Sequence, residues 1–267
     1  MLNSKLTPLL RQYLEVKENY KDCLIFFRLG DFYELFFEDA QLAAKCLDIT
    51  LTKRGQVDGN DIPMCGVPHH HGDNYIAKLL KNGFKVAICE QIETPEESKK
   101  RGQKEIIKRK VVRIATPGTL TEEKELLTSD NNYLMNISFF NDFYNLVVID
   151  ISTGEINLKK CILEKEVLDY ISDIMPSEII VPKNKIYNFI SDNKKKVLTI
   201  TKLEELSKYD QAKQTLTESY VSNSNFKISN FSKNDIISLG TTINYVAYTQ
   251  NGKLPALSIP NNKENND

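Results

Sequence analysis

The stretch LIFFRLGDFYELFFED, residues 24–39, decides the local fold around which the first part of the chain is organised. Its two short apolar runs flank Gly30 and Asp31, a dipeptide typical of tight turns, so the sequence predicts a strand, a turn and a second strand. Successive side chains of a strand alternate between its faces, which puts Phe32 and Glu34 on one face beside the turn. Because a buried carboxylate without a partner is unfavourable, we expect this face to meet solvent or a ligand. Phe32 and Glu34 form the first candidate site.

The bulk composition is that of an ordinary globular protein. The length of 267 residues predicts two domains, and the formal net charge of -1 does not by itself favour a dedicated nucleic-acid domain. No apolar stretch reaches the roughly 18 residues that a membrane-spanning helix needs, and the amino terminus lacks the pattern of a secretory signal. The five cysteines are odd in number and lack CxxC spacing, so we expect neither disulfides nor a zinc site. These features predict a cytoplasmic protein without membrane contact.

Hydrophobic spacing predicts alternating helices and strands in the first part of the chain. Helices are expected within residues 6–19, 38–49 and 71–84, and strands at 85–92 and 106–116. We expect a turn-rich loop over residues 52–70 and a flexible excursion over 93–105. A change of composition and the Pro117–Gly118 turn predict a domain boundary between residues 114 and 125.

The second part begins with β-rich runs and continues with helices. We expect an antiparallel meander of strands at 133–140, 144–152 and 155–163. The later elements expected are helices at 164–174, 185–193 and 233–250 and strands at 178–182 and 196–202. Residues 203–230 are polar and weakly patterned, and the last residues read as a tail with nothing to bury. This alternation predicts a mixed sheet with helices packed on it, an α/β fold.

Six segments of the chain, in order, carry a resemblance to a known family. They are FRLGDFYELFFEDA, LDITLTKRG, IPMCGVPHHH, VAICEQI, KRKVVRIATPGT and DISTGE. Together they resemble the amino-terminal part of the MutS family of bacterial DNA mismatch repair proteins. The resemblance implies a small mixed-sheet mismatch-recognition domain over residues 1–115 and a ribonuclease H-like connector domain over 116–255. Residues 256–267 would be a polar tail or the start of the family's lever region.

The resemblance also implies what else belongs to such a protein. The family's lever, clamp and ATPase domains would follow, and the sequence contains no GxxxxGK[ST] phosphate loop, so we expect an amino-terminal fragment that is not itself an enzyme. ATP and magnesium would bind to the ATPase domain, and no cofactor or metal is expected in these residues. The expected partners are mismatched double-stranded DNA, a MutL-like protein and a second copy joined through other domains. The expected location is the bacterial cytoplasm, at the nucleoid.

The resemblance assigns a role to the Phe-x-Glu motif, here Phe32-Tyr33-Glu34. In the family the Phe enters the minor groove and stacks on a mispaired base, which initiates repair. A mismatched step is poorly stacked and easily kinked, so an apolar wedge is inserted there at lower cost than in a paired duplex. Glu34 would hydrogen-bond the wedged base and repel the phosphates of a duplex that rejects the wedge. Tyr33, on the opposite face, is expected to pack in the core.

Further candidate contacts to DNA come from a basic pair, a loop methionine and a basic strand. Lys53 and Arg54 precede Gly55 and could meet phosphates, although such pairs are usually just a solvated surface. Met64 could pack against the deformed minor groove or against the core.

The basic strand divides its cations between two faces. Alternation predicts Lys108 and Lys110 on one side of the strand, as candidate DNA contacts, and Arg109 and Arg113 on the other.

Two other readings compete with DNA recognition. Asp150 ends a hydrophobic strand, as a magnesium-binding carboxylate of a ribonuclease H-like nuclease would, yet Glu178 is the only further acid on the later strands. The second reading is a protein-binding adaptor that uses the exposed strand and turn. The consecutive histidines at 69–71 do not suggest a metal site, because neighbouring side chains point in different directions.

Overall fold

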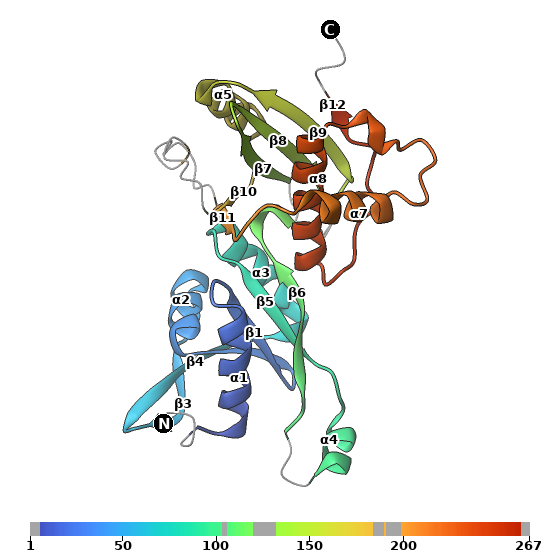
Figure 1. The fold of residues 1–267 in the computed structure, drawn as a ribbon. Coiled ribbons are helices and arrows are strands. Elements are labelled where there is room, and N and C mark those ends of the chain that lie inside the picture. The colour runs from blue at the N-terminus through green and yellow to red at the C-terminus, as the bar shows by residue number, and fades with distance from the viewer. Residues whose placement is uncertain (1–5, 103–105, 120–131, 184–189, 191–198, 263–267) are drawn as a thin grey trace. The chain divides into compact units, whose positions relative to one another are not determined.

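The computed structural model describes residues 6–102, 106–119, 132–183, 190 and 199–262 (Figure 1). The chain divides into two compact units, Met1–Thr116 and Pro117–Asp267. Each unit is built on a six-stranded mixed sheet with helices packed on it. The predicted mixed α/β fold is therefore confirmed. Within the described residues, no helix combines the length and apolar character that crossing a membrane requires.

The first unit has the strand order β3-β4-β2-β1-β5-β6. Strand β1 pairs antiparallel with β2 and parallel with β5, so the sheet is mixed. Its strands are β1 (Leu24–Leu29), β2 (Phe32–Phe36), β3 (Thr52–Val57), β4 (Asn60–Pro68), β5 (Val86–Gln91) and β6 (Arg109–Ala115). Its helices are α1 (Pro8–Asn19), α2 (Phe37–Leu47), the short η2 (His69–His71), α3 (Gly72–Lys81) and α4 (Pro95–Arg101).

The predicted strand, turn and strand form the β1–β2 hairpin. Gly30 has φ +59°, a left-handed conformation that glycine adopts without a steric penalty, and it lets β2 return directly along β1. Leu29 pairs with Phe32, and Phe27 pairs with Glu34. Tyr13 of α1 covers the part of the hairpin that is distant from the turn, where its ring makes edge contacts with Phe27 and Phe36.

A buried carboxylate joins three elements of the first unit. Asp39, in the first turn of α2, is only 3% exposed. It accepts hydrogen bonds from the Tyr13 hydroxyl at 2.7 Å and from the backbone N–H of Ile25 at 3.0 Å. Lys17 Nζ lies 2.8 Å from its other oxygen. Asp39 therefore ties α1 and β1 to the start of α2 through charge-assisted bonds.

The turn-rich loop expected over residues 52–70 is instead the β3–β4 hairpin, which adds two strands to the sheet. Asp58 and Gly59, both at positive φ, form its two-residue turn. Strand β3 was not predicted because its side chains are almost all exposed. It therefore lacks the alternation of apolar and polar residues by which a strand is recognised.

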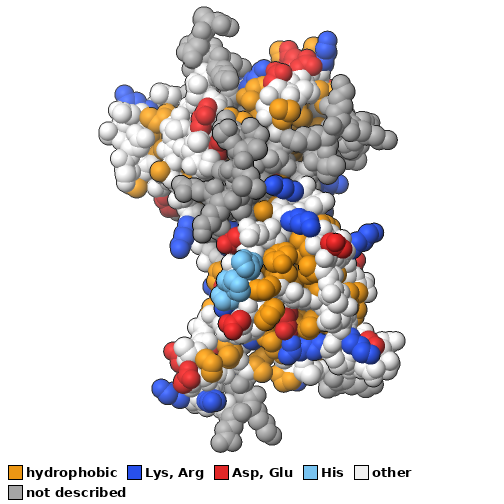
Figure 2. Space-filling model, turned by 180° about the vertical axis from the view of Figure 1, so that it is seen from behind, with side chains coloured by type: hydrophobic (Ala, Val, Ile, Leu, Met, Phe, Trp, Pro, Cys, Tyr) orange, Lys and Arg blue, Asp and Glu red, His pale blue; other side chains and the backbone are white. Residues whose placement is uncertain are grey.

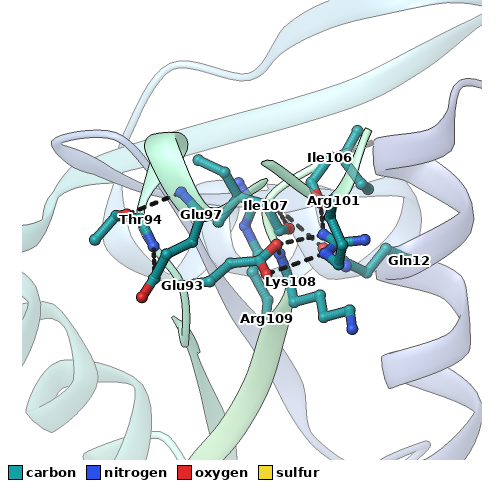
Figure 3. A network of polar contacts seen from close by, with 9 residues as sticks. All are labelled: Gln12, Glu93, Thr94, Glu97, Arg101, Ile106, Ile107, Lys108 and Arg109. Atoms are coloured by element: carbon teal, nitrogen blue, oxygen red, sulfur yellow. Dashed lines mark hydrogen bonds and ion pairs between the residues drawn. The ribbon is translucent and has the colours of Figure 1, made fainter. Parts of the chain in front are cut away.

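The excursion expected over residues 93–105 contains the helix α4. Thr94 and Glu97 form a capping box at its start, and Arg101 near its end forms an ion pair with Glu93 at 2.5 Å (Figure 3). The backbone N–H of Lys108 also donates to Glu93, at 2.6 Å. Glu93 thus holds together both ends of the β5–β6 connection, and local polar bonds order a segment that has almost no apolar residues.

The second unit has the strand order β11-β10-β7-β8-β9-β12. Its strands are β7 (Tyr133–Phe140), β8 (Phe143–Asp150), β9 (Glu155–Cys161), β10 (Glu178–Pro182), β11 (Thr199–Leu203) and β12 (Asn261–Asn262). Its helices are the short η3 (Pro117–Thr119), α5 (Glu164–Ile174), α7 (Tyr209–Ser219), the short η4 (Ile228–Asn230) and α8 (Lys233–Thr249). One sheet face packs against α7 and α8, and the other packs against α5.

Two sequence expectations for this unit are corrected. Helix α7 lies within residues 203–230, and its buried residues are Ala212 and Leu216, so its apolar periodicity is weak. The expected polar tail is partly core, because Leu257 packs against the α7–α8 cluster and β12 pairs with β9. The helix expected at 185–193 lies outside the described residues except for residue 190.

Removing the Asp39 carboxylate should destabilise the first unit. Asp39→Ala leaves Tyr13 and Lys17 without their shared acceptor, so we expect the free energy of unfolding in urea to fall by about 3 kcal/mol. Asp22→Ala is the matched control, since the Asp22 side chain is 70% exposed in its pair with Lys85, and we expect a change below about 1 kcal/mol. Equal losses in the two variants would contradict the proposed role of Asp39.

Candidate nucleic-acid interface

Phe32 and Glu34 lie together beside an open groove, as the strand alternation predicted. Phe32 is 46% exposed and Glu34 is half-buried. Both line a groove of about 600 Å³ whose other lining residues are Asp48, Ile49, Thr50, Thr52, Met64 and Gly66. The groove therefore presents an aromatic ring and a carboxylate side by side.

The same face of β2 is core at one end and open at the other. Phe36 is fully buried against Tyr13, with ring centroids 5.1 Å apart, whereas Phe32 stands next to the turn. A residue outside the hairpin stabilises the turn, because the backbone N–H of His69 donates a hydrogen bond to the Asp31 carbonyl at 2.9 Å. The exposed position of Phe32 is thus fixed by backbone bonds and not by packing of its ring.

Tyr33 packs on the opposite face, as expected. Its ring lies 5.5 Å from that of Phe26, and a Cβ at Gly72 would come within 2.7 Å of it. The Tyr33 hydroxyl donates to the Glu90 carboxylate. Burial, together with this hydrogen bond, raises the pKa of Tyr33 above its ordinary value. Tyr33 therefore anchors the strand that presents its two neighbours.

Glu34 has a partner that sequence reasoning missed. Arg54 Nη1 lies 2.6 Å from Glu34 Oε2, with the Arg54 side chain 43% exposed and that of Glu34 14% exposed. The sequence suggested no partner for Glu34 because the two residues are brought together only by the β3–β4 hairpin. The other predicted cation, Lys53, pairs with Asp61 at 2.9 Å and is strongly exposed.

Met64 packs partly against the core, which was one of the two alternatives, and it also lies beside the candidate site. It lies on β4, opposite Phe36 and Thr52, and packs partly against the core of the first unit. It also lines the groove beside Phe32.

The basic strand β6 carries a correction. A β-bulge shifts the β5–β6 register, so that Cys89 pairs with Val111 and Ile88 pairs with Arg113. The extra residue reverses the alternation, and Arg113 shares a face with Lys110 and not with Arg109. Lys108 and Lys110 are exposed, and Lys110 pairs with Glu90 on the face opposite to Phe32.

Arg109 is the basic residue of β6 that shares a face with the candidate site. Its guanidinium lies 4.9 Å above the ring of Phe27, the cross-strand partner of Glu34. Arg109 also donates to the Arg28 carbonyl at 2.6 Å. It donates to Gln12 Oε1 at 3.0 Å as well (Figure 3). Burial lowers the pKa of Arg109, and the nearby Glu34 carboxylate opposes that shift.

The histidines at 69–71 form a surface turn on the first unit (Figure 2). Among the residues that the structure describes, no three His, Cys, Asp or Glu side chains are grouped to hold a metal ion.

The two acids weighed for a nuclease site lie on opposite faces of the second sheet. Asp150 ends β8 between Ile149 and Ile151, which both belong to the α7–α8 core, so its side chain lies on the other face. Its Oδ1 accepts from the Ser152 hydroxyl at 2.6 Å. Glu178 accepts from the Tyr245 hydroxyl of α8 at 2.6 Å, on the α8 face. These two carboxylates do not converge on one ion.

Comparison with known proteins identifies both parts of the chain. Residues 7–124 match the family model of MutS domain I, and residues 132–258 match that of MutS domain II. DNA mismatch repair protein MutS of Wolbachia pipientis is 43% identical over 97% of this chain and 31% of its own length. The MutS proteins of Anaplasma phagocytophilum and Ruegeria pomeroyi are 41% and 40% identical. The chain spans about 30% of the length of these relatives.

Gly66, which lines the groove and pairs with Glu34, should accept Ala but not Val. A Cβ at Gly66 would lie 3.5 Å from Glu34 Cγ and 3.9 Å from Phe32 Cδ1, which are ordinary contacts. The added methyl groups of Gly66→Val would push Glu34 or Phe32 aside, so we expect about 1–3 kcal/mol of destabilisation in urea unfolding. Gly66→Ala is the control and should change stability much less; a Val variant as stable as the Ala variant would contradict this geometry.

Proposed function

The chain belongs to the MutS family of DNA mismatch repair proteins, whose domains I and II it contains, and on that premise we propose that it recognises mismatched or looped DNA. Residues 1–115 form the recognition domain, and residues 116–255 connect it to the rest of the protein. The observation that carries the proposal is the ring of Phe32, 46% exposed at the end of a rigid hairpin and beside Glu34.

Phe32 acts as a wedge that enters the minor groove and stacks on a mispaired base. Insertion requires two neighbouring base pairs to separate, and the cost of this deformation is lower where a mismatch has already weakened stacking. The ring is presented by the Gly30–Asp31 turn, whose backbone is hydrogen-bonded to His69. The turn therefore loses little conformational entropy on binding. Recognition therefore depends on deformability and not on base sequence, which suits a protein that meets many mismatches.

Glu34 accepts a hydrogen bond from the wedged base and disfavours ordinary duplex. Its carboxylate lies on the same face as Phe32, so a base that stacks on the ring comes within reach. In a duplex that does not open, no base donor reaches the carboxylate, so this favourable contact is missing. The carboxylate therefore contributes more to discrimination than to affinity.

Basic residues of the first unit position the duplex through phosphates. Arg54 and Lys53 lie on the exposed strand β3, and Met64, which lines the groove beside Phe32, packs against the deformed minor groove. Lys110 lies on the other edge strand, β6, and Lys108 immediately precedes that strand, and both meet phosphates further along the duplex. With a net charge of -1 the chain supplies only modest phosphate attraction, so other domains or a partner subunit supply the rest.

The remaining roles follow from the family. The connector transmits the DNA-bound state to a MutL-like protein, and a second subunit joins through domains outside these residues. ATP and magnesium act in the ATPase domain of the family, and the bacterial cytoplasm is the location.

Replacing Phe32 should remove the preference for mismatched DNA. We expect Phe32→Ala to weaken heteroduplex binding by about 1–3 kcal/mol, the contribution of one base stacked on an aromatic ring, and to leave matched duplex almost unchanged. Fluorescence anisotropy with a G·T heteroduplex and its matched homoduplex, at one stated salt concentration, measures both affinities.

Leu42→Ala is the control for that measurement, since Leu42 is a comparably exposed apolar residue on α2, outside the groove. Binding of both duplexes with equal affinity, unchanged by Phe32→Ala, would contradict the wedge and favour a protein-binding adaptor. Magnesium-dependent cleavage that Asp150→Ala abolishes would support the nuclease reading instead.

A further inference from the structure

The ion pair between Arg54 and Glu34 occupies the carboxylate on which the proposed recognition depends. Arg54 Nη1 holds Glu34 Oε2 at 2.6 Å in the chain without DNA. Glu34 lines the groove beside Phe32, so the oxygen that a wedged base would contact is already engaged by a protein cation.

The fold builds this contact across an intervening strand. Strand β4 lies between β2 and β3, so the two backbones are about 10 Å apart, twice the spacing of neighbouring strands. Glu34 is paired with Gly66 of β4, whereas Arg54 lies beyond the Lys53–Pro63 pair in the β3–β4 register, so the ion pair crosses β4 obliquely. A register shift between Lys53 and Gln56 places Arg54 at an irregularity of the edge strand, with Gly55 at φ +74°. The pair therefore joins residues that lie at different levels along the sheet.

The two partners differ in what surrounds them. Glu34 is 14% exposed and fixed on a central strand, whereas Arg54 is 43% exposed on an edge strand. The neighbouring cation Lys53 is held by Asp61, to which Gln56 also donates at 2.7 Å, so it does not compete for Glu34. Arg54 is thus the more exposed partner of a pair that solvent already weakens.

We propose that Arg54 is a specificity-determining residue that exchanges partners when a mismatch is bound. This inference rests on the proposed function of Phe32 and Glu34. In the free chain the guanidinium neutralises Glu34. When the wedge displaces a base toward the groove, the Glu34 carboxylate leaves Arg54 and accepts a hydrogen bond from a donor group of that base. Arg54 then forms an ion pair with a backbone phosphate.

The exchange gives discrimination because both charges need a new partner at once. A mismatched duplex supplies the base donor and the phosphate together, so the pair opens without leaving either charge unpaired. A matched duplex keeps its bases stacked and supplies only phosphates, so opening the pair would leave Glu34 unpaired beside DNA. Matched DNA therefore binds with the ion pair intact.

A double-mutant cycle tests the exchange. Heteroduplex and homoduplex dissociation constants are measured for the wild-type chain, Glu34→Gln, Arg54→Gln and the double variant. Because only heteroduplex binding opens the pair, the wild-type chain should bind it about two- to fivefold more weakly than additivity of the single variants predicts. The homoduplex cycle should be additive. Additive cycles for both duplexes would overturn the exchange.

The salt dependence of heteroduplex binding is a second readout that a purely structural role would not change. If Arg54 takes a phosphate, Arg54→Gln should lower the slope of log Kd against log salt concentration by about one, and Arg54→Lys should restore it. Lys183→Gln is the matched control, since Lys183 forms an exposed ion pair with Glu204 at 3.0 Å in the second unit. An unchanged slope in Arg54→Gln would contradict the phosphate contact.

Phe32→Ala, measured in parallel, separates this proposal from the one on which it rests. If the wild-type chain shows no heteroduplex preference, or Phe32→Ala retains it, the proposed function fails and the exchange fails with it. If Phe32→Ala abolishes the preference while the cycles are additive and the slope is unchanged, the wedge stands and the exchange alone is wrong.

Discussion

The charge-assisted contacts of the buried Asp39 carboxylate are the constraint on which the first unit depends. Asp39 opens α2, and its two oxygens join Tyr13 and Lys17 of α1 and the backbone of Ile25 in β1. The chain returns through β2 between these anchored elements, so the hairpin cannot shift its register without breaking them. A shift of one residue would reverse the faces of β2 and bury Phe32. The exposed position of Phe32 thus depends on a carboxylate that is not part of the groove lining.

The hairpin resolves a conflict between burial and function on one sheet face. A large exposed aromatic side chain is usually unfavourable for solubility. Phe36, four residues further along β2 on the same face, is fully buried because that part of the face is covered. The face becomes open where α1 no longer covers it, and polar groups of Glu34, Asp48 and Thr50 surround Phe32 there. These polar neighbours break up the apolar surface around the ring and leave the ring accessible.

Local alternation in the sequence was sufficient to place Phe32, Glu34 and Tyr33, because their faces follow from a single regular strand. The features that were missed depend on contacts between distant segments. Strand β3 has no buried face, so only its pairing with β4 defines it. The β5–β6 bulge moved Arg113 to the other face, and neither strand alone encodes where the extra residue falls. Arg54 meets Glu34 only because the β3–β4 hairpin brings β3 into the same sheet as β2.

The near-zero net charge of the chain has a local structural basis that bears on how it would meet DNA. Many basic side chains of the first unit already have acidic partners. Examples are Lys17 with Asp39, Lys53 with Asp61, Arg54 with Glu34, Lys85 with Asp22 and Arg101 with Glu93. Cations held in this way give up one partner to gain a phosphate, so the electrostatic gain on ordinary duplex is small. Under the proposed function, such a surface would bind matched DNA weakly, and the difference in deformation energy between mismatched and matched DNA would then decide where the protein binds.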